Sequence, residues 1–156
     1  MMISHPSHIH LTSALQRNTG IVPAGGGFYA AVSQLEHRIH PPTAGEVLVL
    51  PPGTPLICGP VKTFSDAVHA HLHGTFAQSD LRLGVAIMLG HHPDDGLDGA
   101  YGARVRAEID NWLGTLTAFH FWCGDETPPM DKVFGFFDGV AGSWANRRTG
   151  GRRRLN

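Results

Sequence analysis

The segment Asp80–Cys123 reads DLRLGVAIMLGHHPDDGLDGAYGARVRAEIDNWLGTLTAFHFWC, and it has the clearest hydrophobic periodicity in the chain. Within 81–89, aliphatic residues occupy every second position, and this alternation predicts a β-strand. Both faces of that stretch become apolar toward its end, as in a central strand. Apolar residues at helical spacing predict a helix over 100–113, and 116–123 predicts a second strand. The segment therefore predicts a strand–helix–strand unit.

Shorter elements are expected before this unit. Helical spacing of apolar residues predicts an amphipathic helix over Phe28–Ile39, which two prolines end. Aliphatic and β-branched residues predict strands over 46–50 and 56–58, with a Pro-Pro-Gly turn between them. We expect these two strands to form a hairpin. A short strand or turn is expected at 8–15.

These elements predict an α+β fold, in which a single small mixed sheet of about four strands is packed by two main helices. A chain of 156 residues predicts one domain with a real core. We expect an N-terminal arm at 1–27, the domain at 28–140 and a Gly/Arg-rich basic tail at 141–156.

The net charge of −1 conceals an uneven distribution. The last ten residues carry a charge of +5 and the remaining chain carries −6. A basic tail on an acidic body predicts contact with nucleic acid or with an acidic protein surface, and a solvated tail is the alternative. The residues that would make this contact are Arg147, Arg148, Arg152, Arg153 and Arg154.

The chain contains no apolar run as long as the 18 or so residues that a membrane span requires. Histidines interrupt Met1–Ser13, where a signal peptide needs a continuous apolar core. We therefore expect a cytoplasmic or virion protein with no membrane partner. The two cysteines, Cys58 and Cys123, are expected to be reduced and buried.

A cluster of titratable residues, HHPDD at 91–95, follows the predicted strand. A His and an Asp three positions apart can reach one divalent ion, and an Asp between them can serve as general base for a bound water. The cluster resembles the His-Pro-Asp-Asp motif of zinc-dependent N-acetylglucosaminyl deacetylases. The resemblance implies a metal-dependent hydrolase in which His92 and Asp95 bind zinc and Asp94 is the base. The chain departs from the family at Gly96, where the family has an acidic residue.

The same loop also has the composition of a turn followed by a helix cap, with Asp98 as the capping residue. The deacetylase family has a further histidine ligand far downstream. Here the only histidine after the motif is His120.

A second cluster is His69-Ala70-His71-Leu72-His73. On a strand over 68–76 all three imidazoles would point to one side, where they could bind zinc or a phosphate. This row is similar to the histidine-triad nucleotide-binding motif, and His71 is an alternative metal ligand. The other interpretation is a helix over 66–72 capped by Ser65. Without a ligand, the row would face solvent or another subunit.

The expected order of helix, strands and strand–helix–strand over 28–123 resembles small tail-completion or tail-terminator proteins of long-tailed phages. The resemblance implies a non-enzymatic, homo-oligomeric subunit of a larger assembly, such as a virion neck or tail component. Its partners would be protein subunits of the same assembly, and it would have no cofactor. The alternatives are a zinc-dependent hydrolase at His92–Asp95 and a nucleic-acid-binding module that acts through the arginine tail.

Overall fold

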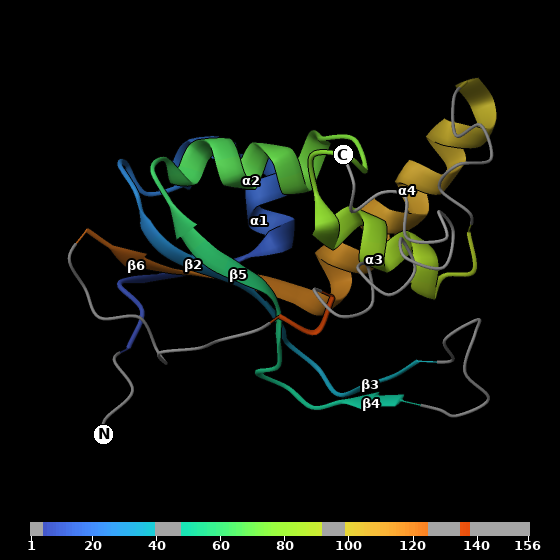
Figure 1. Cartoon of the computed structure of the whole chain (residues 1–156), viewed down its shortest axis with the longest axis horizontal. Helices are drawn as coiled ribbons and strands as arrows, with labels where there is room; N and C mark the ends of the chain where they lie inside the picture. The colour runs from blue at the N-terminus through green and yellow to red at the C-terminus, as the bar shows by residue number, and fades with distance from the viewer. Residues whose placement is uncertain (1–4, 40–47, 92–98, 125–134, 138–156) are drawn as a thin grey trace, which may run out of the picture.

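The main sheet has four antiparallel strands in the order β1-β6-β2-β5, and a separate two-stranded sheet pairs β3 with β4 (Figure 1). This computed structural model describes residues 5–39, 48–91, 99–124 and 135–137. The α+β class and the four-stranded sheet are confirmed, but this sheet is antiparallel and not mixed, and a second sheet accompanies it. The strands are β1 (His8–Leu11), β2 (Gly27–Ser33), β3 (His37–Ile39), β4 (Leu48–Leu50), β5 (Pro55–Val61) and β6 (Thr117–Cys123).

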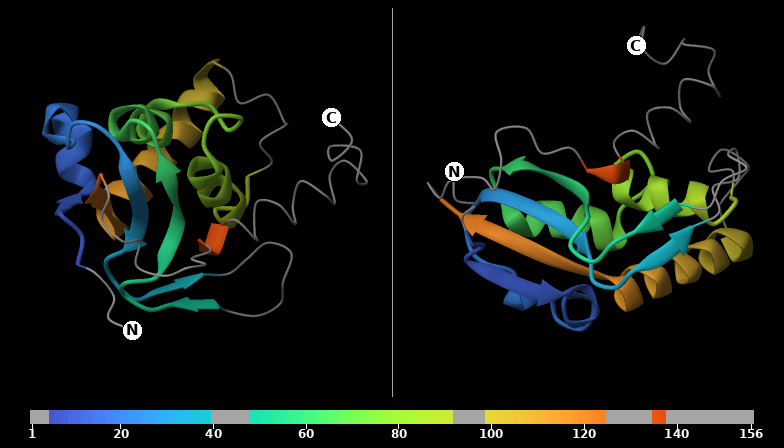
Figure 2. Two further views of the ribbon diagram at one scale, coloured as in Figure 1. Left: turned by 60° about the vertical axis from the view of Figure 1, so that its left-hand side comes forward. Right: turned by 90° about the horizontal axis from the view of Figure 1, so that it is seen from below.

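Helices form the second layer. In Figures 1 and 2, α1 and α2 lie against the main sheet, while α3 and α4 lie toward one end of it. Together with the inner face of the sheet they enclose one hydrophobic core, whose largest members are aromatic and aliphatic side chains with no exposure to solvent. The helices are α1 (Thr12–Arg17), α2 (Phe64–His73), α3 (Asp80–Met88) and α4 (Gly99–Leu116), with a 3-10 turn at Thr19–Ile21.

The predicted helix over Phe28–Ile39 is wrong, because this stretch forms β2 and β3. Every residue from Tyr29 to Ser33 is buried: Tyr29 and Ala31 lie in the main core, while Ala30 and Val32 alternate with them and pack with Trp122. Leu35, which completed the apparent helical stripe, is 54% exposed and contributes nothing to the core. The helical spacing was therefore a coincidence in a stretch that is apolar on both sides.

The predicted strand over 81–89 is also wrong, because it forms α3. Residues 81–88 are all buried, including Arg82, so burial surrounds the whole helix and the alternation of aliphatic residues does not indicate a β-strand. The start of the helix is fixed locally by Ser79, whose Oγ accepts a hydrogen bond from the Arg82 N–H at 3.1 Å. Asp80 in the first turn also suits the helix dipole. The observed unit is therefore helix–helix–strand, in which the predicted helix (α4) and final strand (β6) are confirmed.

The strands predicted near 46–50 and 56–58 exist, but the hairpin between them is wrong. β4 pairs with β3, and β5 pairs with β2 in the main sheet. A turn at Gly53, with φ of +84°, lets the chain leave one sheet and enter the other. The two-stranded sheet thereby projects from the main body (Figure 1).

The first described residues belong to the main sheet. β1 pairs with β6 in a register that places His10 opposite Phe119. Leu15 of α1 is fully buried in the core. Within the ranges that the structure describes, no helix is long and apolar enough to cross a membrane.

Candidate functional site

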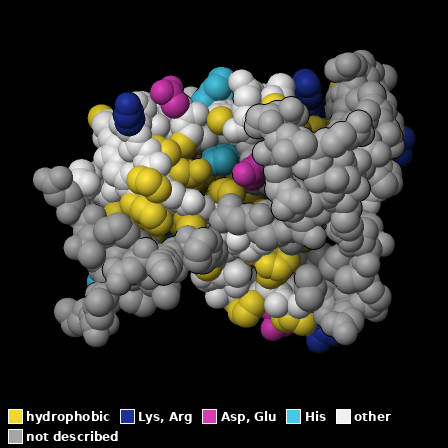
Figure 3. All heavy atoms as spheres, viewed as in Figure 1, with side chains coloured by type: hydrophobic (Ala, Val, Ile, Leu, Met, Phe, Trp, Pro, Cys, Tyr) yellow, Lys and Arg dark blue, Asp and Glu magenta, His cyan; other side chains and the backbone are white. Residues whose placement is uncertain are grey.

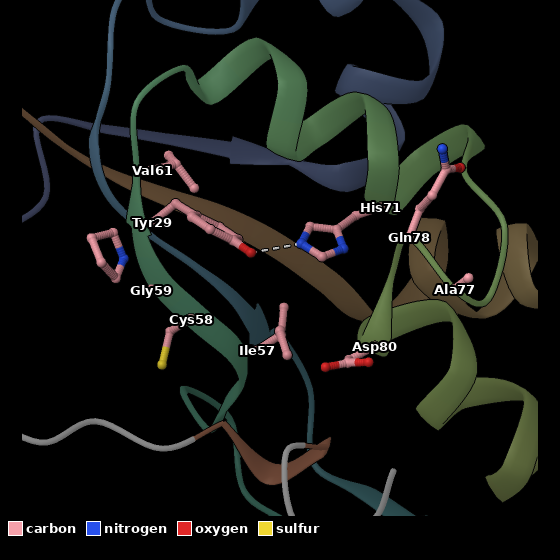
Figure 4. A pocket seen from close by; sticks show the side chains of 10 residues that line it. Tyr29, Ile57, Cys58, Gly59, Val61, His71, Ala77, Gln78 and Asp80 are labelled. Carbon is pink, nitrogen blue, oxygen red and sulfur yellow. Dashed lines mark hydrogen bonds between the residues drawn. The ribbon is translucent and has the colours of Figure 1, made fainter. Parts of the chain in front are cut away.

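A groove of about 360 Å³ lies between β5 and the start of α3 (Figure 4). One wall is the run of β5 from Ile57 to Val61. The other wall comes from the α2–α3 connection and the first residue of α3, with the side chains of Gln78 and Asp80. Tyr29 and His71 meet between the two walls and form the floor.

The floor is built around the imidazole of His71. Its Nε2 is hydrogen-bonded to the hydroxyl of Tyr29 at 2.7 Å, and its Nδ1 to the Oγ of Ser79 at 2.7 Å. These three residues come from β2, α2 and the N-cap of α3. One imidazole therefore ties the sheet to two helices.

Burial first, and the nearby Arg82 guanidinium second, lower the pKa of His71 to about 4. The ring is therefore neutral at pH 7, with one nitrogen donating and the other accepting a hydrogen bond. Both nitrogens have protein partners, so the hydrogen-bonding capacity of the ring is used inside the protein.

Arg82 extends the same network behind the floor. Its side chain is buried, and its Nη1 donates to Asp110 Oδ1 at 2.8 Å. The same nitrogen donates to the backbone carbonyls of Leu72 at 3.0 Å and His71 at 3.3 Å. These are carbonyls of the last turn of α2, so the guanidinium caps that helix and links it to α4.

The order Ser79–His71–Tyr29 has the hydrogen-bonded arrangement of a nucleophile, a base and an orienting group. However, Ser79 is only 1% exposed and does not line the groove. Its Oγ is occupied as the cap of α3. The network therefore fixes the shape of the groove, and its serine is not placed to attack a bound molecule.

The two walls differ in polarity. The β5 wall contains no charged side chain, although the exposed surface of the groove is on balance more polar than apolar. Figure 3 shows hydrophobic side chains on this face of the molecule beside a histidine and an acidic side chain. On the opposite wall, the Gln78 side chain accepts a hydrogen bond from the Thr75 N–H, whereas Asp80 has no hydrogen-bond or ion-pair partner among the described residues. The groove thus places an uncharged strand opposite the carboxylate of Asp80.

The histidine row at 69–73 lies on α2, so the strand over 68–76 is wrong and the helical interpretation is confirmed. The residue that precedes the helix is Thr63, and the predicted cap Ser65 lies inside the first turn. Helical geometry sends His71 into the core and leaves His69 and His73 exposed. The three rings consequently do not form one row.

No three His, Cys, Asp or Glu side chains are placed to hold one metal ion in the described part of the chain. The predicted residues His92, Asp94 and Asp95 lie outside that part, as does the proposed cap Asp98. The five arginines of the tail lie outside it as well.

Other histidines also have described surroundings. The Nε2 of His91 lies 2.7 Å from Oε2 of Glu108 in α4, within hydrogen-bond distance. His120 lies on β6 with its ring 6.2 Å from that of Trp122, and burial lowers its pKa.

Comparison of the chain with protein-family models, curated proteins and solved structures finds no match. The site therefore has to be interpreted from its own geometry. One signal in the sequence pointed to it: Ser79 followed by an acidic residue and an apolar run is a helix-start pattern. Tyr29 carried no such signal, because its partner lies 42 positions away in the chain.

Proposed function

We propose that the protein is a non-enzymatic subunit of a larger protein assembly, and that the groove between β5 and α3 receives an extended segment of a partner protein. The supporting observation is the contrast between the walls: a strand without charged side chains faces the carboxylate of Asp80, which has no hydrogen-bond or ion-pair partner among the described residues. An extended segment with uncharged side chains and one basic side chain is complementary to both walls.

The floor supports a binding role more than a chemical one. The polar groups of the floor already form hydrogen bonds among Tyr29, His71 and Ser79, so few of them are left for an incoming molecule. Because the network links β2, α2, α3 and α4, it holds the walls in place before a partner arrives. Preorganisation of this kind reduces the entropy that binding would otherwise cost.

The proposal names no particular assembly. The resemblance to phage tail proteins rested on an order of elements that began with a helix at 28–39 and included a strand at 81–89. Since the observed elements there are strands and a helix respectively, the proposal rests on the groove alone. The zinc-dependent hydrolase and the nucleic-acid-binding tail stay predictions, because His92–Asp95 and the tail lie outside the described residues.

The proposal is tested by selecting binders from a library of random decapeptides on the full-length protein. We expect the enriched peptides to combine uncharged residues with one lysine or arginine. Their affinity should fall about fivefold to tenfold in the Asp80→Asn variant, because an ion pair at a partly desolvated site contributes on the order of 1 kcal/mol.

A matched control is Asp66→Asn. Asp66 is also an exposed acidic residue in the first turn of a helix, but it does not line the groove. Peptides that bind Asp80→Asn and Asp66→Asn equally well would contradict the assignment of the groove. Peptides that fail to shift the amide resonances of residues 57–61 would contradict it too.

A further inference from the structure

His69 and His73 form a pair on the outer face of α2. They are four residues apart in the helix, and both side chains are exposed. Their ring centroids are 5.3 Å apart, with an angle of 54° between the ring planes. The pair lies away from the floor of the groove, since His71 on the same helix points inward.

This separation is the one that a shared metal ion requires. Two imidazoles that bind one tetrahedral ion, each through a nitrogen about 2 Å from the metal, place their ring centroids roughly 5 Å apart. Histidines at positions i and i+4 of a helix are a recurrent ligand pair, because the helix fixes both side chains on one face. The pair is thus set for chelation with little rearrangement.

We infer that His69 and His73 bind one divalent late transition-metal ion, in a site that is independent of the proposed function. Imidazole ligands favour Cu²⁺ over Ni²⁺ and Zn²⁺ in the usual order of stability. Asp66 lies one turn earlier on the same face and adds negative charge nearby. Because the protein supplies two ligands, water fills the remaining positions of the ion.

A second histidine pair provides a contrast. His8 and His10 on β1 have ring centroids 6.1 Å apart and nearly parallel planes, at 12°. The lone pairs of parallel stacked rings run side by side and do not converge on a single ion. We therefore expect the α2 pair to be the tighter site, although both pairs contain two imidazoles.

The test is a titration of the full-length ¹⁵N-labelled protein with substoichiometric Cu²⁺, followed by NMR. Paramagnetic broadening is expected to centre on residues 66–74. In parallel, calorimetric titration with Ni²⁺ should show affinity reduced at least about tenfold in His69→Gln and in His73→Gln, since even outer-shell changes around a metal cost tenfold or more. Both side chains are exposed, so these variants should fold normally, which thermal unfolding without metal will verify.

The matched control is the double variant His8→Gln/His10→Gln, in which the Ni²⁺ affinity of the first site should be unchanged. Broadening centred on residues 8–10 or on His91 would overturn the inference. So would a His69→Gln/His73→Gln variant that binds Ni²⁺ as tightly as the unaltered protein.

Discussion

At the scale of single residues, His71 is the residue that joins Tyr29, Ser79 and Arg82 in one hydrogen-bond network. It is 6% exposed, it bonds through both ring nitrogens, and its backbone carbonyl accepts from Arg82. A neutral imidazole suits this position because it is at once a donor and an acceptor. A charged imidazole would bring a second positive charge next to the buried guanidinium.

The protein should therefore lose stability in acid. The pKa of His71 is about 4 in the folded protein and near its ordinary value of 6.5 after unfolding. Between pH 4 and pH 6.5, His71 is protonated in the unfolded chain but neutral in the folded protein. The stability that the neutral form contributes is therefore complete above pH 6.5 and is lost as the pH falls toward 4. The free energy of unfolding should drop by roughly 3 kcal/mol across this window on account of His71. Urea unfolding at pH 7, 5.5 and 4.5 measures this decrease in the free energy of unfolding.

The control is a variant without the titrating group, Tyr29→Phe/His71→Leu, which removes both partners of the 2.7 Å hydrogen bond. Its stability should vary less with pH over the same window, even if it is lower throughout. An equally steep decline in this variant would show that other groups, such as His120 with its lowered pKa, cause the acid sensitivity.

At the scale of elements, α3 is held by close packing as well as by its cap. Gly84 in the middle of α3 faces Phe137, whose side chain is fully buried. A Cβ added at Gly84 would lie 2.5 Å from the Phe137 ring. The glycine is thus required by its neighbour, although glycine is a poor residue for a helix interior.

We predict that Gly84→Ala destabilises the protein by about 1–3 kcal/mol, because overpacking outweighs the gain in helix propensity. The comparison is Gly114→Ala in α4, where the nearest atoms belong to the flexible end of the Gln16 side chain. That change should stay within about 1 kcal/mol of the unaltered protein. Chemical denaturation compares the two variants directly.

A double-mutant cycle isolates the cause. Phe137→Leu should recover part of the loss in Gly84→Ala, since a smaller side chain makes room for the methyl group. If the two changes are simply additive, contact between Gly84 and Phe137 is not the reason for the destabilisation.

The elements also show where sequence patterns suffice. The long helix α4 was predicted because its apolar residues recur at one clear helical period. β6 is buried on both faces, and it was predicted because it is short and rich in aromatic residues. β2 and α3 were misassigned because both are buried on all sides, so that hydrophobicity carries no period. In such segments a capping residue indicates the secondary structure better than the periodicity does, and Ser79 is the residue that indicates the start of α3.

At the scale of the whole molecule, the sheet joins segments that no local pattern connects. β6 lies between β1 and β2, so its edges are protected by strands from the first part of the chain. The groove could not be foreseen for the same reason: its floor joins Tyr29 to His71, and its wall β5 was expected to pair with β4.

Removal of residues 1–11 should therefore leave β6 as an unprotected edge. Its inner residues Phe119 and Phe121 are fully buried, and an exposed apolar edge strand promotes association between chains. We predict lower stability and aggregation of the truncated protein, measured by urea unfolding and light scattering.

The control is Ile9→Thr/Leu11→Thr in the full-length chain. Both side chains are more than half exposed, so backbone pairing of β1 should persist and stability should change by no more than about 1 kcal/mol. A truncated protein that stays monomeric and fully stable would show that β1 is dispensable.

The two paired strands β1 and β6 are synthesised at different times on the ribosome. Thr12, which follows β1, shares a hydrogen bond with Thr117, the first residue of β6, and the two are 105 residues apart. At about 5–20 residues per second, the ribosome makes β1 roughly 5–20 seconds before its neighbour exists. During that interval the nascent chain carries Ile9 and Leu11 with no strand beside them. A chaperone that binds short apolar segments would meet β1 earlier than β6 does.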